Sequence, residues 1–344
     1  MRKTLGFAGL LFLMVWVIAG TCMAAPLNEI RLGVILITND ESHCFMFGGL
    51  GLSPEKTKET GFLTGVGYDA AFSPDYKPAW PTWEGVTITA VYGHAGVEAA
   101  EKFRASMKEP KQVTVCKTLE ELFEHSNCLF MVSTAANGEQ KDELVPKCLE
   151  SGKPLFVDKF VASDSAHAKK FVEMAAQRKV LLMSSSLLHK SQPMLEMKSQ
   201  LSGRKPTRII SAGWSGENIA GDIHPIAHLL SAAENRRPAR VFYDAAAKPK
   251  TVVTFDDGLI GELVAPEPDA PFVVHVETED DVFTAVFRNE DLRAAAINQL
   301  GTFFDAVRGK DAGMSPTSMI DYLAVWDGAQ KSKTSGEPVS VVVE

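Results

Sequence analysis

Asp158 and Lys159 are the residues best placed for chemistry in this chain. They follow an apolar run, Leu155-Phe156-Val157, and precede a segment, 162–165, that is typical of a helix start. Ligands bind at the carboxyl ends of the strands in open α/β sheets, so this pattern predicts that Lys159 lies at the mouth of a cleft. Desolvation there can depress its pKa and make it a proton donor or acceptor. The alternative is a solvated loop lysine, the usual environment of this residue type.

His224 and His228 lie four residues apart in a segment, 223–233, whose pattern predicts a helix, so both imidazoles would share one face. Both histidines, together with Asp222 just before the helix, are candidates to contact a substrate. No glutamate follows His224 directly and no third ligand is evident, so we predict no metal site. The alternative for His224 is a structural histidine that caps the helix or packs at its start.

A long, proline-rich and aromatic segment separates the first two predicted strands. Trp80 and Trp83 stand in its richest part, residues 76–83. They could bind substrate by stacking on a sugar ring, or they could cover the edge of the sheet, since aromatic side chains serve both uses. Loops of this length are often functional.

The elements that must position these residues change in type along the chain. Up to residue 186 strands alternate with helices, which implies a doubly wound parallel sheet. These strands are predicted at 30–37, 86–92, 128–133, 155–158 and 180–183, and the helices at 95–107, 118–124, 141–151 and 166–178. After residue 205 we predict strands at 207–212, 240–243, 251–255, 272–276 and 282–287, with helices at 223–233, 291–308 and 315–332.

The fold class is therefore α/β, with two domains that share a cleft. We predict an N-terminal Rossmann-like domain of dinucleotide-binding type at residues 26–186. A C-terminal α+β domain with a largely antiparallel sheet follows at 187–344, for substrate binding and oligomerisation.

Composition limits the partners. The chain is 45% hydrophobic and carries a net charge of −8 without a long Lys/Arg run, which argues against nucleic acid as a partner. The cysteines that follow residue 25 form no CxxC pair and have no zinc-like spacing, so buried thiols are the default and a disulfide stays open: Cys44, Cys116, Cys128 and Cys148.

Residues 1–25 are typical of a signal peptide for the general export route. Arg2 and Lys3 precede a nearly continuous apolar run, 5–18, and small residues near Ala25 suit cleavage. We therefore expect a periplasmic or extracellular protein without a membrane span after processing. A lipoprotein anchor at Cys22 is the weaker alternative, because Thr21 stands where a smaller residue is expected.

The order of these features resembles the glucose–fructose oxidoreductase and inositol dehydrogenase (Gfo/Idh/MocA) family. The segment 152–160 is similar to the family's Gly-Lys-Pro and Glu-Lys-Pro motif, which implies that Lys159 contacts both substrate and nicotinamide. The segment 223–226 is similar to the family's substrate-domain helix, which implies that His224 is the acid/base on a sugar hydroxyl. Ala220 stands where the family often has an aspartate, and Asp158 replaces the usual glutamate. The resemblance also implies dimers or tetramers.

The resemblance further implies NAD or NADP as cofactor, but two parts of the expected binding site are missing. No G-x-G-x-x-G turn follows the first strand, and no ribose-binding acid ends the second. The remaining candidates for cofactor binding follow strands at the same edge of the sheet: Thr38, Asn39, His43, Ser133, Asn137 and Lys159.

The sequence is compatible with three functions. The first is an oxidoreductase that acts on a sugar or polyol, with Lys159 and His224 as catalytic residues and a nicotinamide cofactor. The second is an exported carbohydrate-binding or regulatory protein of the same fold that has lost nicotinamide binding and redox activity. The third is elimination or hydrolysis without a cofactor, using Lys159, His224 and His43.

Overall fold

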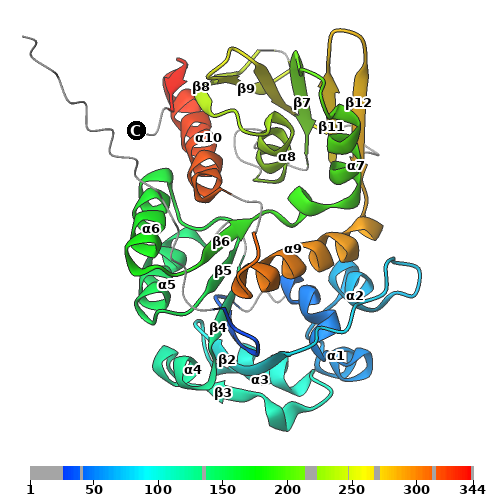
Figure 1. The fold of residues 1–344 in the computed structure, drawn as a ribbon, viewed down its shortest axis with the longest axis vertical. Coiled ribbons are helices and arrows are strands. Elements are labelled where there is room, and N and C mark those ends of the chain that lie inside the picture. Colours follow the sequence, from blue (N-terminus) through cyan, green and yellow to red (C-terminus); the bar gives the residue numbers. More distant parts are fainter. Residues whose placement is uncertain are drawn as a thin grey trace, which may run out of the picture.

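The structure is a computed structural model, and it describes residues 26–38, 42–133, 137–213, 223–246, 248–266, 272–311 and 315–341. Within these residues, one β-sheet forms the lower part of the molecule and another the upper part, with helices around and between them (Figure 1). No helix in these ranges is long and apolar enough to span a membrane. The four cysteines after residue 25 are buried, and no disulfide joins any two of them.

The first sheet contains, in the described chain, six parallel strands in the order β3-β2-β1-β4-β5-β6. This is the doubly wound order of dinucleotide-binding folds, with its switch point between β1 and β4. The predicted parallel sheet is confirmed, although the three-residue β3 escaped prediction. The strands are β1 (Ile30–Leu36), β2 (Val86–Gly93), β3 (Thr114–Cys116), β4 (Cys128–Val132), β5 (Leu155–Asp158) and β6 (Leu182–Ser185).

Side chains of β1 alternate between two cores, one on each face of this sheet. Ile35 belongs to the core beneath α4 (Leu119–His125), α5 (Gly138–Glu150) and α6 (Ser165–Arg178). Leu32, Val34 and Leu36 belong to the opposite core, beneath η1 (Ser42–Leu50), α3 (Val97–Ala105) and α9 (Leu292–Val307). Strands buried on both faces explain the continuous apolar runs of the sequence.

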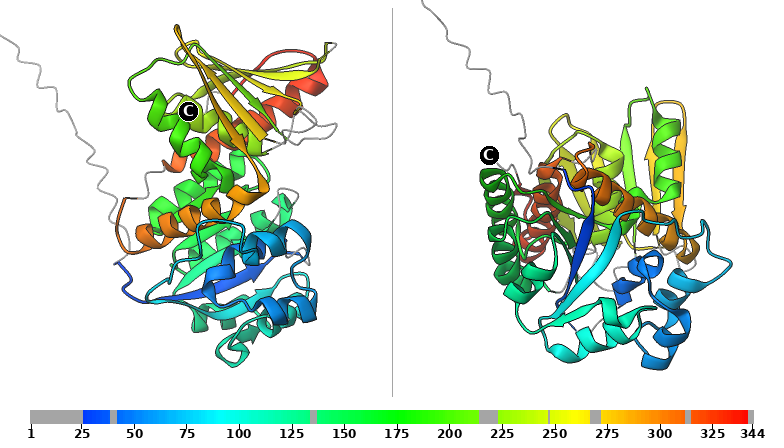
Figure 2. Two further views of the ribbon diagram at one scale, coloured as in Figure 1. Left: turned by 90° about the vertical axis from the view of Figure 1, so that its right-hand side faces the viewer. Right: turned by 60° about the horizontal axis from the view of Figure 1, so that its bottom comes forward.

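Helix α9 follows the second sheet in sequence but packs on the first. Its Phe303 ring lies 6.4 Å from that of Phe130 and 5.4 Å from that of Phe156. In both views of Figure 2, α9 (orange) lies between the two sheets. The domain boundaries remain a prediction, but this helix ties the later part of the chain to the first sheet.

The long segment between β1 and β2 is folded. It contains the 3₁₀ helix η1 and the helices α1 (Pro54–Thr60) and α2 (Gly65–Phe72). Buried aromatic residues of η1 hold it on the first sheet, since the ring of Phe47 lies 5.2 Å from that of Phe130. A further short 3₁₀ helix, η2 (Pro110–Gln112), precedes β3.

The second sheet has, within the described ranges, seven strands in the order β12-β11-β7-β10-β9-β8-β13. Its neighbouring strands are antiparallel except for β7 with β10, so the largely antiparallel sheet is confirmed. The strands are β7 (Arg208–Ala212), β8 (Pro238–Asp244), β9 (Lys250–Phe255), β10 (Ile260–Val264), β11 (Phe272–Glu277), β12 (Val282–Phe287) and β13 (Val339–Ser340). Strand β10 was not predicted, because the buried Glu262, paired with Arg208 and Lys250, interrupts its apolar pattern.

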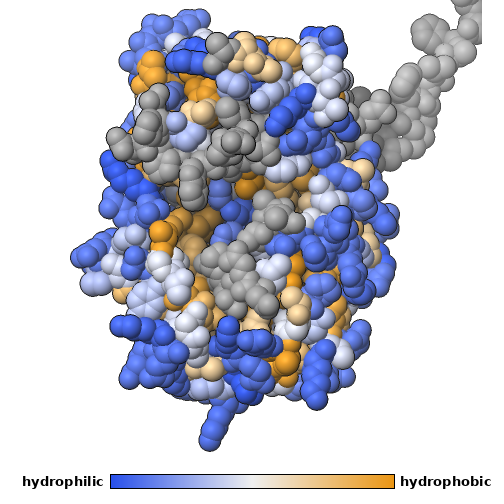
Figure 3. Space-filling view, turned by 180° about the vertical axis from the view of Figure 1, so that it is seen from behind, coloured by the Kyte–Doolittle hydropathy of each residue, from blue (hydrophilic) through white to orange (hydrophobic). Residues whose placement is uncertain are grey.

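Helices connect the two sheets into one structure. Helix α8 (Ile223–Ala233) has the predicted bounds; η3 (Leu187–Lys190), α7 (Gln192–Leu201), η4 (Asn289–Asp291) and α10 (Pro316–Ser335) complete the elements. One core runs from Phe171 of α6 through Leu323 of α10 to Val253 of the second sheet. On the back face, apolar side chains gather around a hollow at mid-height, while hydrophilic ones dominate the outer edges (Figure 3).

Candidate active site

Lys159 leaves the end of β5 into a buried site. Its relative exposure is 7%, which excludes the solvated loop lysine considered from sequence. The next residue, Phe160, is also buried and contacts Trp326 of α10 with ring centroids 5.3 Å apart. The turn after β5 is therefore packed between the two parts of the molecule, and this packing fixes the position of the lysine.

Lys159 and His224 meet although they come from different domains. Lys159 Nζ lies 2.6 Å from His224 Nε2, and His224 Nδ1 lies 2.9 Å from the Oγ of Ser186. Burial, and then the charge of Lys159, lower the pKa of His224 well below its ordinary value, so the imidazole is neutral near pH 7. Its Nε2 accepts from the lysine ammonium, and its Nδ1–H donates to Ser186.

Asp158 binds His43 from the segment that follows β1. His43 Nδ1 contacts Asp158 Oδ2, the backbone N–H of Lys159 donates to Asp158 Oδ1 at 3.0 Å, and Ser133 Oγ donates to the Asp158 carbonyl at 3.0 Å. Burial alone would raise the pKa of Asp158, but the positive groups around it outweigh burial and hold the pKa below its ordinary value. The ionised carboxylate thus fixes His43 against the end of β5.

Lys141 is a site residue that the sequence reading missed. It is fully buried in α5, and its Nζ donates to the Lys159 carbonyl at 2.9 Å. Burial lowers the pKa of Lys141 to about 7. An isolated lysine within an amphipathic helix pattern gives no local signal of burial, because only the fold brings α5 beneath the end of β5.

These groups line a cavity of about 310 Å³. This volume is near the lower end of the range of small-molecule sites, and apolar walls with a few converging polar groups are typical of such sites. The polar groups belong to His43, Asp158, Lys159 and His224. The apolar lining comes from η1, α2, η3, β11 and α9: Phe45, Met46, Val66, Leu187, Leu188, Phe272 and Leu292.

His228 does not reach this cavity. It is fully buried and stacked on Phe287, with centroids 4.1 Å apart, and neither ring nitrogen has a hydrogen-bond partner among the described residues. Burial lowers its pKa to about 3. His228 packs on Phe287 of the second sheet and is not among the residues that line the cavity, so its predicted contact with a substrate stays a prediction. The described residues contain no group of three or more His, Cys, Asp or Glu able to hold a metal ion.

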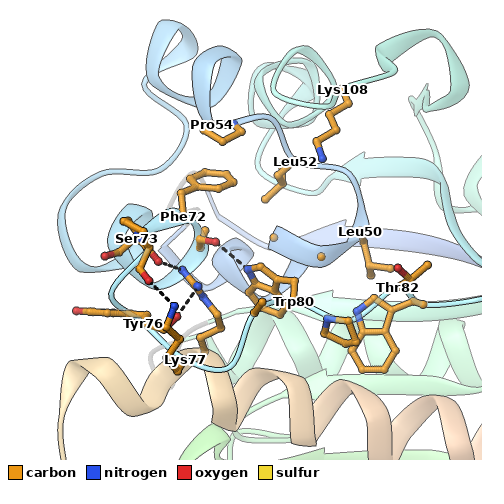
Figure 4. A pocket seen from close by; sticks show the side chains of 18 of the residues that line it. Leu50, Leu52, Pro54, Phe72, Ser73, Tyr76, Lys77, Trp80, Thr82 and Lys108 are labelled. Atoms are coloured by element: carbon orange, nitrogen blue, oxygen red, sulfur yellow. Dashed lines mark hydrogen bonds between the residues drawn. The ribbon is translucent and has the colours of Figure 1, made fainter.

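Trp80 and Trp83 line a different hollow, formed by the insert and α9 (Figure 4). Trp80 Nε1 donates to the Ala71 carbonyl at 2.7 Å, and the Trp83 ring packs edge-on against Phe304 at 5.2 Å. They pack against the fold and are not among the residues that line the cavity of Lys159. Their predicted stacking on a sugar ring stays a prediction.

The remaining candidates lie around the same edge of the first sheet. Thr38 follows β1 and is partly buried, while Ser133 after β4 and Asn137 before α5 are buried. None of these three is among the residues that line the cavity. Asn39 and Asp222 lie outside the described residues, so their proposed roles remain predictions.

Residues 65–186 match the model of a family described as "Oxidoreductase family, NAD-binding Rossmann fold", GFO_IDH_MocA. The matched residues include β2 to β6 of the first sheet, so this part of the chain is similar to the Gfo/Idh/MocA family. The match begins after β1 and the residues that follow it. No protein with a curated description matches the sequence.

Solved structures of similar fold cover nearly the whole chain. A putative myo-inositol dehydrogenase from Sinorhizobium meliloti has a TM-score of 0.65 at 11% identity, covering 91% of this chain and 100% of that one. A scyllo-inositol dehydrogenase from Lactobacillus casei with NAD(H) and scyllo-inositol has a TM-score of 0.62 at 12% identity, covering 91% and 99%. A probable dehydrogenase from Thermotoga maritima has a TM-score of 0.64 at 16% identity, covering 91% and 99%. At these identities the likeness shows the fold.

The sequence that directly follows β1 has no G-x-G-x-x-G pattern, although the pyrophosphate of a dinucleotide needs a glycine-rich turn there. Residues 39–41 of this turn lie outside the described residues. Gly48 and Gly49 lie farther along the chain, in η1, and Trp80 and Trp83 cover them: a Cβ on Gly48 would lie 2.6 Å from Trp80 Nε1, and one on Gly49 3.1 Å from Trp83 Nε1. These two glycines therefore make room for indole rings.

Proposed function

We propose that the cavity binds a sugar or polyol and that Lys159 and His224 exchange a proton with one of its hydroxyl groups, in an oxidoreductase reaction. The hydrogen-bonded Lys159–His224 pair on the cavity wall carries this proposal. The family of the Rossmann domain and the inositol dehydrogenases of similar fold support the reaction class.

Residues of this chain can accept the hydroxyl proton that the reaction releases. Oxidation of a hydroxyl-bearing carbon requires loss of the hydroxyl proton, and a positioned base within hydrogen-bond reach speeds this step by about 10²–10⁴-fold. Lys159 would pass a proton from its ammonium to His224 Nε2 and then take the proton of the hydroxyl group, while Ser186 orients the imidazole. NAD or NADP would serve as hydride acceptor in this family, but the sequence after β1 lacks the glycine-rich turn that would hold its pyrophosphate.

The test is turnover of a panel of inositols and hexoses with NAD or NADP at millimolar concentration. We expect production of reduced cofactor, lowered by about 100-fold or more in Lys159→Ala because the base is lost. Lys147→Ala, on the exposed face of α5, is the matched control and should keep full activity. Absence of binding of both cofactors by calorimetry would contradict the oxidoreductase proposal.

A second candidate is a carbohydrate-binding or regulatory protein without redox activity. The sequence after β1 favours it, since no G-x-G-x-x-G turn stands there to hold a pyrophosphate. Calorimetric binding of an inositol or hexose by a protein that binds neither cofactor, weakened in Lys159→Ala, is the result expected for this function.

We also propose that the chain is exported and that it assembles into dimers or tetramers. The basic and apolar pattern of residues 1–25 supports export. Mass spectrometry of protein from cell fractions should find a mature chain that starts near residue 25 outside the cytoplasm. Light scattering on a size-exclusion column would measure the oligomeric state.

A further inference from the structure

The His43–Asp158 pair is a second acid/base pair on the cavity, and the proposed oxidoreductase reaction does not use it. The side chain of Asp158 is 2% exposed and that of His43 is 24% exposed, so the carboxylate is buried behind an accessible ring. Both Asp158 oxygens are engaged, Oδ2 by His43 Nδ1 and Oδ1 by the Lys159 N–H. The carboxylate is therefore fixed in position.

The carboxylate also sets the tautomer of His43. A carboxylate that accepts from Nδ1–H leaves Nε2 as the basic nitrogen, which is the arrangement that makes a histidine a general base. Among the described residues, His43 Nε2 has no hydrogen-bond partner, and His43 lines the cavity. Asp158 thus fixes the His43 ring through Nδ1 and leaves Nε2 accessible to a ligand in the cavity.

The same cavity carries an acid. Lys159 Nζ donates to a neutral imidazole, so its ammonium form is the proton-bearing partner of the Lys159–His224 pair. Most of the other lining residues are apolar, which strengthens the interaction of both pairs with a bound ligand. No arginine is among the lining residues of the described chain, so an uncharged ligand suits the site better than an anionic one.

We infer that this cavity enolises a small, uncharged α-hydroxy carbonyl compound, such as a ketose, without a nicotinamide cofactor. His43 Nε2 removes the proton from the carbon next to the carbonyl. The C–H electron pair becomes the C=C bond, the carbonyl π pair moves to oxygen, and Lys159 Nζ protonates that oxygen. The resulting enediol takes the proton back from His43 at either carbon and returns the other proton to Lys159. No oxidant or reductant is consumed, and the net result is isomerisation or proton exchange.

The test is hydrogen exchange in deuterium oxide, followed by NMR on dihydroxyacetone and fructose with no nicotinamide added. We expect the wild-type protein to exchange the C–H next to the carbonyl at least about 100-fold faster than His43→Asn, since general bases contribute about 10²–10⁴-fold. Asp158→Asn keeps the His43 ring but removes the carboxylate that sets its tautomer, and should also slow exchange. Circular dichroism and thermal unfolding verify that each variant is folded.

His167→Asn is the matched control, because His167 is also a histidine bonded to an aspartate, Asp164, at 3.0 Å, but lies on α6 away from the cavity. It should exchange at the wild-type rate. If wild-type protein exchanges neither compound faster than folded His43→Asn, or if folded Asp158→Asn matches the wild type, the inference is overturned. Neither outcome affects the oxidoreductase proposal, which is measured separately with NAD or NADP.

Discussion

The cavity at Lys159 and the hollow at Trp80 contain similar kinds of side chain but use their polar groups differently. In the cavity, His43 and Lys159 present nitrogen atoms at the wall. In the hollow, Trp80 Nε1 donates to Ala71, and Arg293 donates to the carbonyls of Ala70, Ser73 and Tyr76 (Figure 4). The hollow is the larger, at about 710 Å³ against about 310 Å³. The polar groups of the cavity bond one another, whereas those of the hollow bond backbone carbonyls of the insert. We therefore expect the cavity to bind a ligand and the hollow to stabilise the insert.

Arg293→Met provides the strongest test of this difference. Arg293 is 5% exposed and bonds Ala70, Tyr76 and Ser73 at 2.9, 2.7 and 2.7 Å. Hydrogen bonds from charged groups contribute about 1.5–3 kcal/mol each, so we expect the loss of three to lower the free energy of unfolding by about 4.5–9 kcal/mol, measured with urea. Ligand affinity of the folded fraction should stay unchanged. Normal stability would show that the insert is not held by these bonds.

Lys141 provides the next largest effect, on the side of the cavity. Its pKa is lowered by burial from 10.5 to about 7, so between these pH values the unfolded chain binds more protons than the folded protein. The free energy of unfolding should therefore rise with pH across this window, by about 3–5 kcal/mol at most. Urea unfolding at several pH values should show this rise in the wild type and lose it in Lys141→Met. Lys147→Met, at an exposed lysine, should keep it.

Gly48→Ala tests the packing of the insert with a smaller change. The added Cβ would lie 2.6 Å from Trp80 Nε1, and overpacking of this kind costs about 1–3 kcal/mol. Gly301→Ala is the control, because its Cβ would meet Trp83 at an ordinary 3.5 Å within a helix. We expect thermal unfolding to show destabilisation for the first and a neutral or stabilising effect for the second. Equal changes in thermal unfolding for the two variants would contradict a tight contact between Gly48 and Trp80.

Ser186→Ala should give the smallest change. It removes the partner of His224 Nδ1, a hydrogen bond that contributes about 1 kcal/mol, and also the Oγ that accepts from the Leu188 N–H at the start of η3. We expect about three- to tenfold weaker ligand binding in calorimetry, and a loss of about 1 kcal/mol in the free energy of unfolding because the cap is lost. Ser184→Ala, at the neighbouring strand, serves as the control. Unchanged binding in Ser186→Ala would mean that His224 is positioned by other contacts.

Local patterns in the sequence predicted most of the first sheet and parts of the site. The bounds of α8 and the position of Lys159 after β5 followed from apolar periodicity and turn residues. Other elements were not predicted, among them α1, α2, α7, β3, β10 and β13. Strand β3 is too short, β10 carries a buried charged residue, and the packing of α9 on the first sheet depends on contacts distant in sequence.

The sequence by itself determined the parallel sheet, the later antiparallel sheet, and an acid and a lysine at the end of a buried strand. These features depend on residues close together in the sequence, because the spacing of apolar residues indicates which face of a strand or helix is buried. Only the tertiary structure decided which groups surround Lys159. His224 lies 65 residues from it, and His43 lies 115 residues from Asp158. Contacts over such distances leave no period in the sequence, because they depend on how the two domains pack.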